Sequence, residues 1–328
     1  MAENPFTERG RITEPRRFAG RWSELSLIFD AIQAGRPVLV SGGPGIGKSS
    51  LLGHIADAAA ANLEREDLRA YYLDLADATA APQVYRTVVE ALGQRGETAA
   101  ALEVALLADD APTLLCLDNA HAAIAAGWGA GMLEALARTV RSGALILVAA
   151  LDGAPPLLSE RFAHVRLGAF APAEVRLLAD AYLDGTGVQF TPQDLRELAR
   201  LSVAHPAYVQ RAASHLFRSK LEPGYDWRAA YLAEARERPV PGAPLPPAVF
   251  EGDGAGSLDP SRYGGDERGV ARHGPQLAQL PDLPPALAFA LPLLAAALLF
   301  VVSGNIPLAL VVGLGGIVAV AAWLRRGT

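Results

Sequence analysis

Cysteine and lysine are scarce in this sequence. Cys116 is the single cysteine among 328 residues, so no internal disulfide can form, and its place in an apolar run predicts a buried thiol in a reducing compartment. Lys48 and Lys220 are the two lysines, and every other basic side chain is an arginine. The six histidines are scattered without the spacing of zinc ligands, so we predict no zinc-type metal site.

Clusters of basic residues and an apolar N-terminal segment are also missing. The formal net charge is −6 and the isoelectric point is near 5.6. Binding to a phosphate backbone depends on clustered lysine and arginine, so these values argue against a nucleic-acid partner. Residues 1–10 are polar and lack the hydrophobic stretch of a secretory signal, so we expect the first domain in the cytosol.

A glycine-rich motif is the most specific feature of the sequence. Residues 42–49 read GGPGIGKS and match the pattern G-x-x-x-x-G-K-S/T in full. The apolar segment 37–41 precedes the motif as a buried strand would, and a helical pattern runs from Lys48 to Glu66. A strand, a glycine loop and a helix in this order direct backbone N–H groups and a helix N-terminus at phosphate.

The motif predicts a binding site for ATP and Mg²⁺. Lys48 would reach the β- and γ-phosphates, and the Ser49 hydroxyl would ligate the metal. Lys48 is one of two lysines in a chain that otherwise uses arginine, which supports this interpretation. A chance glycine turn is the alternative, and the flanking strand and helix disfavour it. The predicted phosphate-binding residues are Gly42, Gly43, Pro44, Gly45, Ile46, Gly47, Lys48, Ser49 and Ser50.

A second apolar segment ends in a carboxylate. Residues 113–119 read TLLCLDN, which is the form of a Walker B strand. We predict that Asp118, at the tip of this strand, holds the Mg²⁺ ion through water. Lys48, Asp118 and Asn119 are the predicted catalytic residues, and Ser49 and Asp118 are the predicted metal-binding residues. Apolar strands that end in aspartate are common, so this assignment depends on the glycine-rich motif upstream.

The order of the predicted elements indicates an α/β fold, a P-loop NTPase core over residues 1–169. Apolar segments alternate with helical patterns, which is typical of a mainly parallel sheet flanked by helices on both faces. Ser23 is expected to cap the first helix, and Gly35 to end it. The expected strands are 37–41, 71–75, 113–117, 144–151 and 164–167. The other expected helices are 48–66, 82–92, 97–107 and 132–141.

The pattern becomes all-helical in residues 170–237, which we interpret as a small lid domain. Thr191 would cap one of its helices, with Pro192 as the first helical residue and Asp194 in the first turn. The other expected helices are 172–183, 206–220 and 226–236. Residues 238–285 are rich in proline and glycine and contain few large apolar side chains, so we predict a disordered linker.

The C-terminal part contains most of the excess apolar residues. No charged residue occurs from 283 to 324. The turn signal at 303–305 divides this run into two spans of about 18 residues, each long enough as a helix for a bilayer core of about 30 Å. A buried hairpin in a soluble core would normally keep a polar stripe. We therefore predict transmembrane helices at about 286–303 and 306–324, which attach the NTPase domain to the cytoplasmic membrane on the cytosolic side.

Several segments together resemble the STAND and AAA-like P-loop ATPases of bacteria and archaea. They are Asn4-Pro5-Phe6, Phe18-Ala19-Gly20-Arg21 with Glu24-Leu25, the P-loop ending Ile46-Gly47-Lys48-Ser49-Ser50-Leu51-Leu52, and Ala204-His205-Pro206-Ala207-Tyr208-Val209-Gln210. The resemblance covers about residues 4–220. It implies that Phe18, Gly20 and Arg21 line the base side of the nucleotide and that His205 lies near its phosphates. A core aromatic, a turn and a helix-start histidine are the alternative interpretations.

Two positions depart from the pattern of that family. The residue after the metal-binding carboxylate is usually acidic there and polarises the attacking water, whereas Asn119 can orient water but cannot accept its proton. We therefore expect slow hydrolysis. Where many relatives carry a polar or arginine sensor after the fourth predicted strand, this chain has Leu151-Asp152. The candidates for an arginine finger are Arg138, Arg141 and Arg161.

These features predict a membrane-anchored Mg-ATP-binding protein, a slow ATPase that acts as a nucleotide-dependent switch in signalling or defence. ATP would bind between core and lid, and the change would pass to the hairpin, to a protein partner or to further copies in a homo-oligomer. One alternative is an effector whose hairpin disrupts the membrane when the ATPase assembles, although the hairpin has no charge to line a pore. Another is a DNA-associated AAA-like ATPase, which the acidic charge disfavours.

Overall fold

The computed structural model describes residues 3–109, 111–140, 143–153 and 161–251. The expected transmembrane hairpin at 286–324 and most of the expected linker lie outside these residues. Within the part of the chain that the structure describes, no helix is long and apolar enough to span a bilayer.

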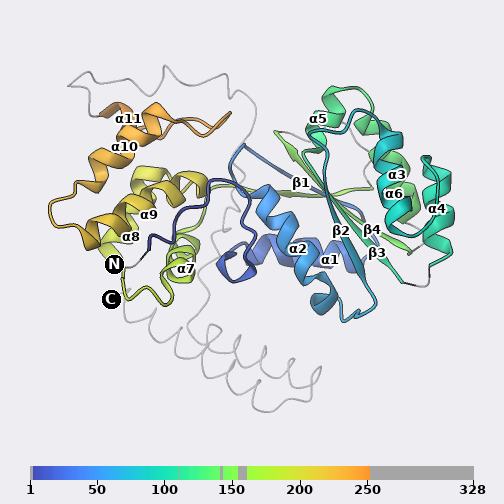
Figure 1. The fold of residues 1–328 in the computed structure, drawn as a ribbon, viewed down its shortest axis with the longest axis horizontal. Coiled ribbons are helices and arrows are strands. Elements are labelled where there is room, and N and C mark those ends of the chain that lie inside the picture. Colours follow the sequence, from blue (N-terminus) through green and yellow to red (C-terminus); the bar gives the residue numbers. More distant parts are fainter. Residues whose placement is uncertain (1–2, 110, 141–142, 154–160, 252–328) are drawn as a thin grey trace, which may run out of the picture. The chain divides into compact units, whose positions relative to one another are not determined.

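A five-stranded parallel sheet forms the centre of the fold (Figure 1). Its strands are β1 Val38–Gly42, β2 Arg69–Asp74, β3 Thr113–Asp118, β4 Leu145–Asp152 and β5 Ala163–Arg166. Their spatial order is β2-β3-β4-β1-β5, and every neighbouring pair is parallel. Every residue of β1 and β3 is buried, as expected for strands covered on both faces. The predicted parallel sheet is confirmed.

Helices cover the two faces of the sheet and bury a separate apolar cluster on each (Figure 1). On one face lie α1 Trp22–Gln33 and α2 Lys48–Asn62. On the other lie α3 Ala81–Ala91, α4 Ala99–Leu107, α5 Ala120–Ala125 and α6 Gly129–Thr139. Successive side chains of a strand point to opposite faces, so Leu114 and Cys116 join the α1 and α2 cluster and Leu115 and Leu117 the other. This is the P-loop NTPase arrangement that the sequence predicted.

The start of α1 differs from the prediction. Trp22 is the first helical residue, so Ser23 lies inside the helix and cannot cap it. Arg21 holds the cap position in a left-handed conformation, with a φ of 61°. The backbone N–H of Arg21 donates to Glu174 Oε1 at 2.7 Å. This long-range contact fixes the turn before α1, which explains why the local capping signal of Ser23 is not used.

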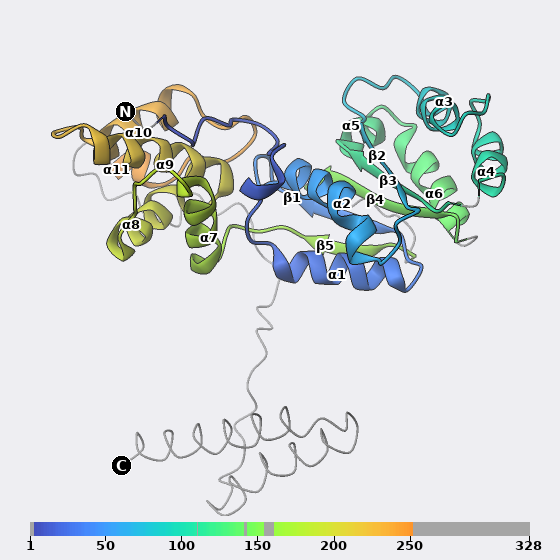
Figure 2. The ribbon, with the colours of Figure 1, turned by 60° about the horizontal axis from the view of Figure 1, so that its bottom comes forward.

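Five helices form a second group beyond the sheet, which we call the helical domain (Figure 2). They are α7 Pro172–Leu183, α8 Pro192–Ser202, α9 Pro206–Leu221, α10 Trp227–Glu237 and α11 Ala248–Glu251. The predicted cap of α8 is confirmed, because the Thr191 hydroxyl accepts a hydrogen bond from the Asp194 N–H at 3.1 Å. A short 3₁₀ helix, η1 Pro15–Arg17, precedes α1.

Two segments outside the predicted boundaries pack into the helical domain. Phe6 is fully buried there and stacks on Tyr182, with ring centroids 5.1 Å apart. Val240 and Val249 are buried in the same apolar cluster. The chain therefore starts in the helical domain and crosses to the sheet. The first part of the predicted linker, up to residue 251, instead completes this domain because its few apolar side chains find a common core.

Candidate functional site

The glycine-rich loop lies between β1 and α2, at the carboxyl end of the parallel strands. Gly45 and Gly47 have φ values of 69° and 97°, a region that residues with a side chain rarely adopt. Gly47 is the N-cap residue of α2, and Lys48 is its first helical residue. The loop therefore presents a helix N-terminus with unpaired backbone N–H groups, which is suited to bind phosphate.

Lys48 is buried within this loop, with 7% of its surface exposed. Its ammonium donates to the carbonyl oxygens of Gly42 at 3.1 Å and Gly43 at 2.6 Å. It also forms an ion pair with Asp152 Oδ1 at 2.6 Å. Asp152 is the last residue of β4 and lies opposite Gly42 in the register of β1 and β4. The carboxylate that pairs with the loop lysine therefore lies about 100 residues away in the sequence, on a neighbouring strand.

Asp118 occupies the carboxyl end of β3 and is 2% exposed. Its Oδ2 accepts a hydrogen bond from the Tyr72 hydroxyl at 2.6 Å, and its Oδ1 accepts one from the Asn119 N–H at 2.9 Å. Burial raises the pKa of Tyr72, and the hydrogen bond to Asp118 raises it further, so the hydroxyl remains a donor. A fixed carboxylate at this edge and the Ser49 hydroxyl at the start of α2 are oxygen donors of the kind that Mg²⁺ prefers.

The side chain of Asn119 is tied to a neighbouring strand. Its amide Nδ2 donates to Asp74 Oδ1 at 2.7 Å, and its backbone adopts a left-handed conformation with a φ of 53° at the N-cap of α5. Asp74 ends β2 and lies opposite Asp118 in the register of β2 and β3. Sequence reasoning missed Asp74, although its place in a predicted strand made it a candidate.

Arg21 connects the glycine-rich loop to the start of the helical domain. It is 4% exposed, and its guanidinium donates to the Ile46 carbonyl at 3.1 Å and to the Gly168 carbonyl at 2.7 Å. It also pairs with Glu24 at 2.9 Å and lies over the Phe170 ring, 4.6 Å from its centroid. The residue that the resemblance assigned to the base side is therefore also a structural link between the two parts.

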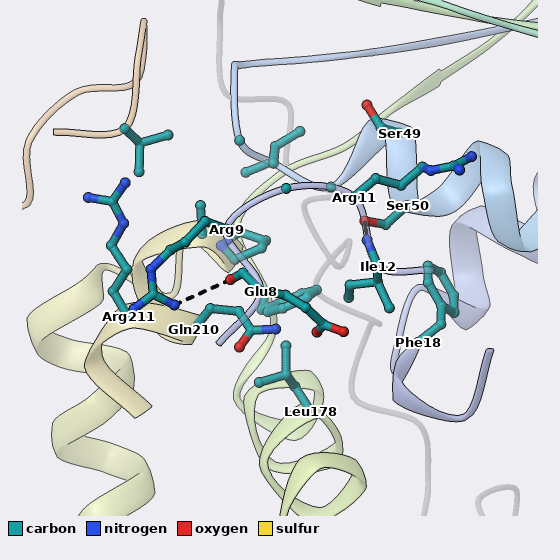
Figure 3. A pocket seen from close by; sticks show the side chains of 18 of the residues that line it. Glu8, Arg9, Arg11, Ile12, Phe18, Ser49, Ser50, Leu178, Gln210 and Arg211 are labelled. Carbon is teal, nitrogen blue, oxygen red and sulfur yellow. Dashed lines mark hydrogen bonds between the residues drawn. The ribbon is translucent and has the colours of Figure 1, made fainter. Parts of the chain in front are cut away.

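A cavity of about 260 Å³ lies between the N-terminal segment, the glycine-rich loop and α9 (Figure 3). Phe18 stacks on His54 at one side, with ring centroids 4.1 Å apart, and Gln210 lies on the other side. Gln210 is 7% exposed, and neither atom of its amide makes a hydrogen bond within the described residues. The predicted nucleotide-binding residues that line the cavity are Phe18, Arg21, Gly45, Ile46, Gly47, Ser49 and Ser50.

Other residues of the site were predicted less well. The cavity is also lined by residues 8–12 and Gln210, which the sequence analysis did not predict as binding residues. Gly20 does not line the cavity and packs on Glu174 instead. A Cβ at position 20 would lie 2.9 Å from Glu174 Oε1. Arg138 and Arg161 are likewise absent from its lining, and Arg141 lies outside the described residues.

His205, at the N-cap of α9 in the helical domain, contacts the glycine-rich loop. Its Nε2 lies 3.1 Å from the Pro44 carbonyl oxygen, and burial lowers the pKa of its imidazole, so the neutral ring donates this hydrogen bond. A Cβ at Gly45 would come within 3.0 Å of His205 and 2.7 Å of Val240. A glycine is therefore required at position 45 both for its backbone conformation and for the close approach of the helical domain.

Comparison with known proteins agrees with this geometry. Residues 17–148 match the model of the AAA ATPase domain. The fold is similar to that of the ORC1 protein of Aeropyrum pernix, solved in complex with DNA, with a TM-score of 0.51, 15% identity and coverage of 70% of this chain and 68% of that chain. A Walker-type ATPase of Pyrococcus abyssi gives a TM-score of 0.51, 13% identity and coverage of 71% and 76%.

At these identities the similarity shows the fold alone. No curated protein matches the chain. The domain match, the parallel sheet and the glycine-rich loop nevertheless agree on one class of protein. Residues 17–148 are similar to the AAA ATPase domain, a class of ATPase that has such a loop.

Proposed function

We propose that this chain is a slow Mg-ATPase that works as a nucleotide-dependent switch, with the helical domain as its moving part. The observation that carries the proposal is the hydrogen bond from His205, at the start of α9, to the Pro44 carbonyl of the glycine-rich loop. A change in the loop on nucleotide binding acts directly on this contact. Because Arg21 and Glu174 join the same two parts, the loop and α7 are coupled by a second route.

The side chains of the site have distinct tasks in this proposal. Lys48 binds the phosphate oxygens, and Ser49 and Asp118 hold Mg²⁺, which when bound neutralises phosphate charge. The cavity beside Phe18 accepts the base. Asn119 cannot take a proton from water, and its amide is engaged by Asp74, so the bound ATP persists. Slow turnover suits a switch because the ATP state must last long enough to be sensed.

The switch is tested by hydrogen exchange of the full chain in detergent, with and without Mg-ATP. We expect ATP to slow exchange in the glycine-rich loop and to change exchange in residues 203–210, where α9 meets the loop. Lys48→Ala should abolish both effects. If ATP slows exchange in the loop but leaves exchange in residues 203–210 unchanged, the chain binds nucleotide but the proposed switch is wrong.

Membrane attachment through residues 286–324 is part of the proposal and rests on their sequence. A two-span hairpin returns the chain to its starting side, and Arg325-Arg326 agrees with the positive-inside bias. In intact cells we expect an impermeant thiol reagent to label a cysteine placed at Asn305 but not one placed at Thr328. The native Cys116 is buried and gives no background. Labelling at Thr328 alone would contradict this topology.

No contact among the described residues favours the DNA-associated or the membrane-disrupting alternative over a switch. The structure of the Aeropyrum pernix protein contains DNA, but a likeness of 15% identity does not transfer that partner to this chain.

A further inference from the structure

Asp152 forms an ion pair with Lys48, the loop lysine that binds phosphate in the proposed function. We infer that this carboxylate is an internal counter-ion that holds the loop lysine when no nucleotide is bound and that lowers the affinity of the site for ATP. The inference rests on the proposed function, because it requires the glycine-rich loop to bind ATP. It assigns a regulatory role to Asp152, which reaches Lys48 because β4 lies beside β1.

Lys48 is held inside the protein by two hydrogen bonds and one ion pair. An ammonium group has three N–H donors. Two of them donate to the carbonyl oxygens of Gly42 and Gly43, and the carboxylate of Asp152 forms an ion pair with the ammonium at 2.6 Å. The lysine side chain is 8% exposed and that of Asp152 is 33% exposed, so the pair is only partly screened by water. A phosphate that binds Lys48 therefore competes with the Asp152 carboxylate for the same positive charge.

Asp152 cannot move far from the loop when it is displaced. Its backbone is paired with Gly42 in the sheet, and the N–H of Gly153 donates to the Gly42 carbonyl at 3.2 Å. A phosphate on the loop therefore lies near a fixed negative charge, and like charges at short range repel. Among the described residues, His121 also faces this carboxylate, with its Nε2 3.7 Å from Asp152 Oδ2.

The charge of Asp152 should matter more for ATP than for ADP. Both nucleotides place a phosphate at Lys48, but ATP carries the additional γ-phosphoryl group and more negative charge in the loop. Asp152→Asn keeps the shape of the side chain and removes its charge. We expect this variant to bind Mg-ATP about tenfold more tightly than the wild type and to gain less for Mg-ADP.

The experiment is calorimetric titration of the full chain in detergent with Mg-ATP and with Mg-ADP. A matched control is Asp194→Asn, because Asp194 forms the ion pair of the second lysine, Lys220, at 2.7 Å in the helical domain. Asp194→Asn should leave both affinities unchanged. Thermal unfolding of both variants shows whether the fold is retained.

The outcomes separate the inference from the proposed function. Tighter ATP binding by Asp152→Asn, with Asp194→Asn unchanged, supports the inference. Equal or weaker ATP binding by a folded Asp152→Asn overturns it while the wild type still binds ATP. If neither the wild type nor Asp152→Asn binds ATP, both the proposed function and the inference are wrong.

Discussion

Lys48→Ala is expected to weaken binding of Mg-ATP by about 100-fold, because the substitution removes the positive charge that the loop directs at the phosphates. The backbone N–H groups at the start of α2 remain and account for the residual affinity. The lysine is buried, but the Asp152 carboxylate that loses its partner is 33% exposed and can be hydrated, so the fold should persist. Calorimetry gives the affinity, and circular dichroism on heating gives the stability.

The chain supplies a control for this prediction. Lys220 is the other lysine and lies on α9, where it pairs with Asp194. Lys220→Ala removes the same charge from the same type of ion pair away from the glycine-rich loop, and it should leave ATP affinity unchanged. If Lys48→Ala binds ATP as tightly as the wild type does, residues 42–49 do not form the phosphate site.

The parts of the fold that the sequence predicted correctly have strong local patterns. The glycine-rich loop between an apolar strand and a helix, and the capped start of α8, are defined by neighbouring residues. Helix α5 was missed because Ala120–Ala125 has only six residues, four of them alanine, which is too short to show an apolar periodicity. The burial of Phe6 in the helical domain was missed because its partners lie far along the chain.

The same distinction applies to the site. Lys48 and Asp118 were identified from motifs, and both lie at the carboxyl edge of the sheet. The contacts that change their chemistry come from other strands. Asp152 reaches Lys48 because β4 lies beside β1, and Asp74 reaches Asn119 because β2 lies beside β3. Strand order is set by tertiary packing, so no local pattern could have revealed these pairs.

Asn119→Glu is expected to raise the rate of ATP hydrolysis by about 10²-fold or more, because a general base typically contributes 10²- to 10⁴-fold. Affinity for ATP should change little, since position 119 would act on the attacking water and not on the bound nucleotide. Two features of the fold should lower the stability of this variant. Its backbone φ of 53° suits asparagine better than glutamate, and the new carboxylate would face Asp74 in place of the present hydrogen bond.

The nearby charge of Asp74 also raises the pKa of the introduced carboxyl group, because a like charge disfavours ionisation. Asn119→Gln is the matched control, since glutamine has the size of glutamate without its basicity and should leave hydrolysis slow. Asp74→Asn combined with Asn119→Glu removes the repulsion and should recover stability lost in the single variant. Single-turnover hydrolysis and thermal unfolding of the four proteins measure these effects separately.

The competing explanation is that His121 already supplies the base. Its Nε2 lies 3.7 Å from Asp152, and a histidine beside a carboxylate can accept a proton from water. In that case the wild type hydrolyses ATP rapidly, His121→Ala slows it, and Asn119→Glu brings no gain. A slow wild type that Asn119→Glu accelerates and His121→Ala leaves unchanged would instead assign the low rate to the missing carboxylate at position 119. The chain would then be an ATPase whose turnover is limited by one side chain, as a long-lived switch requires.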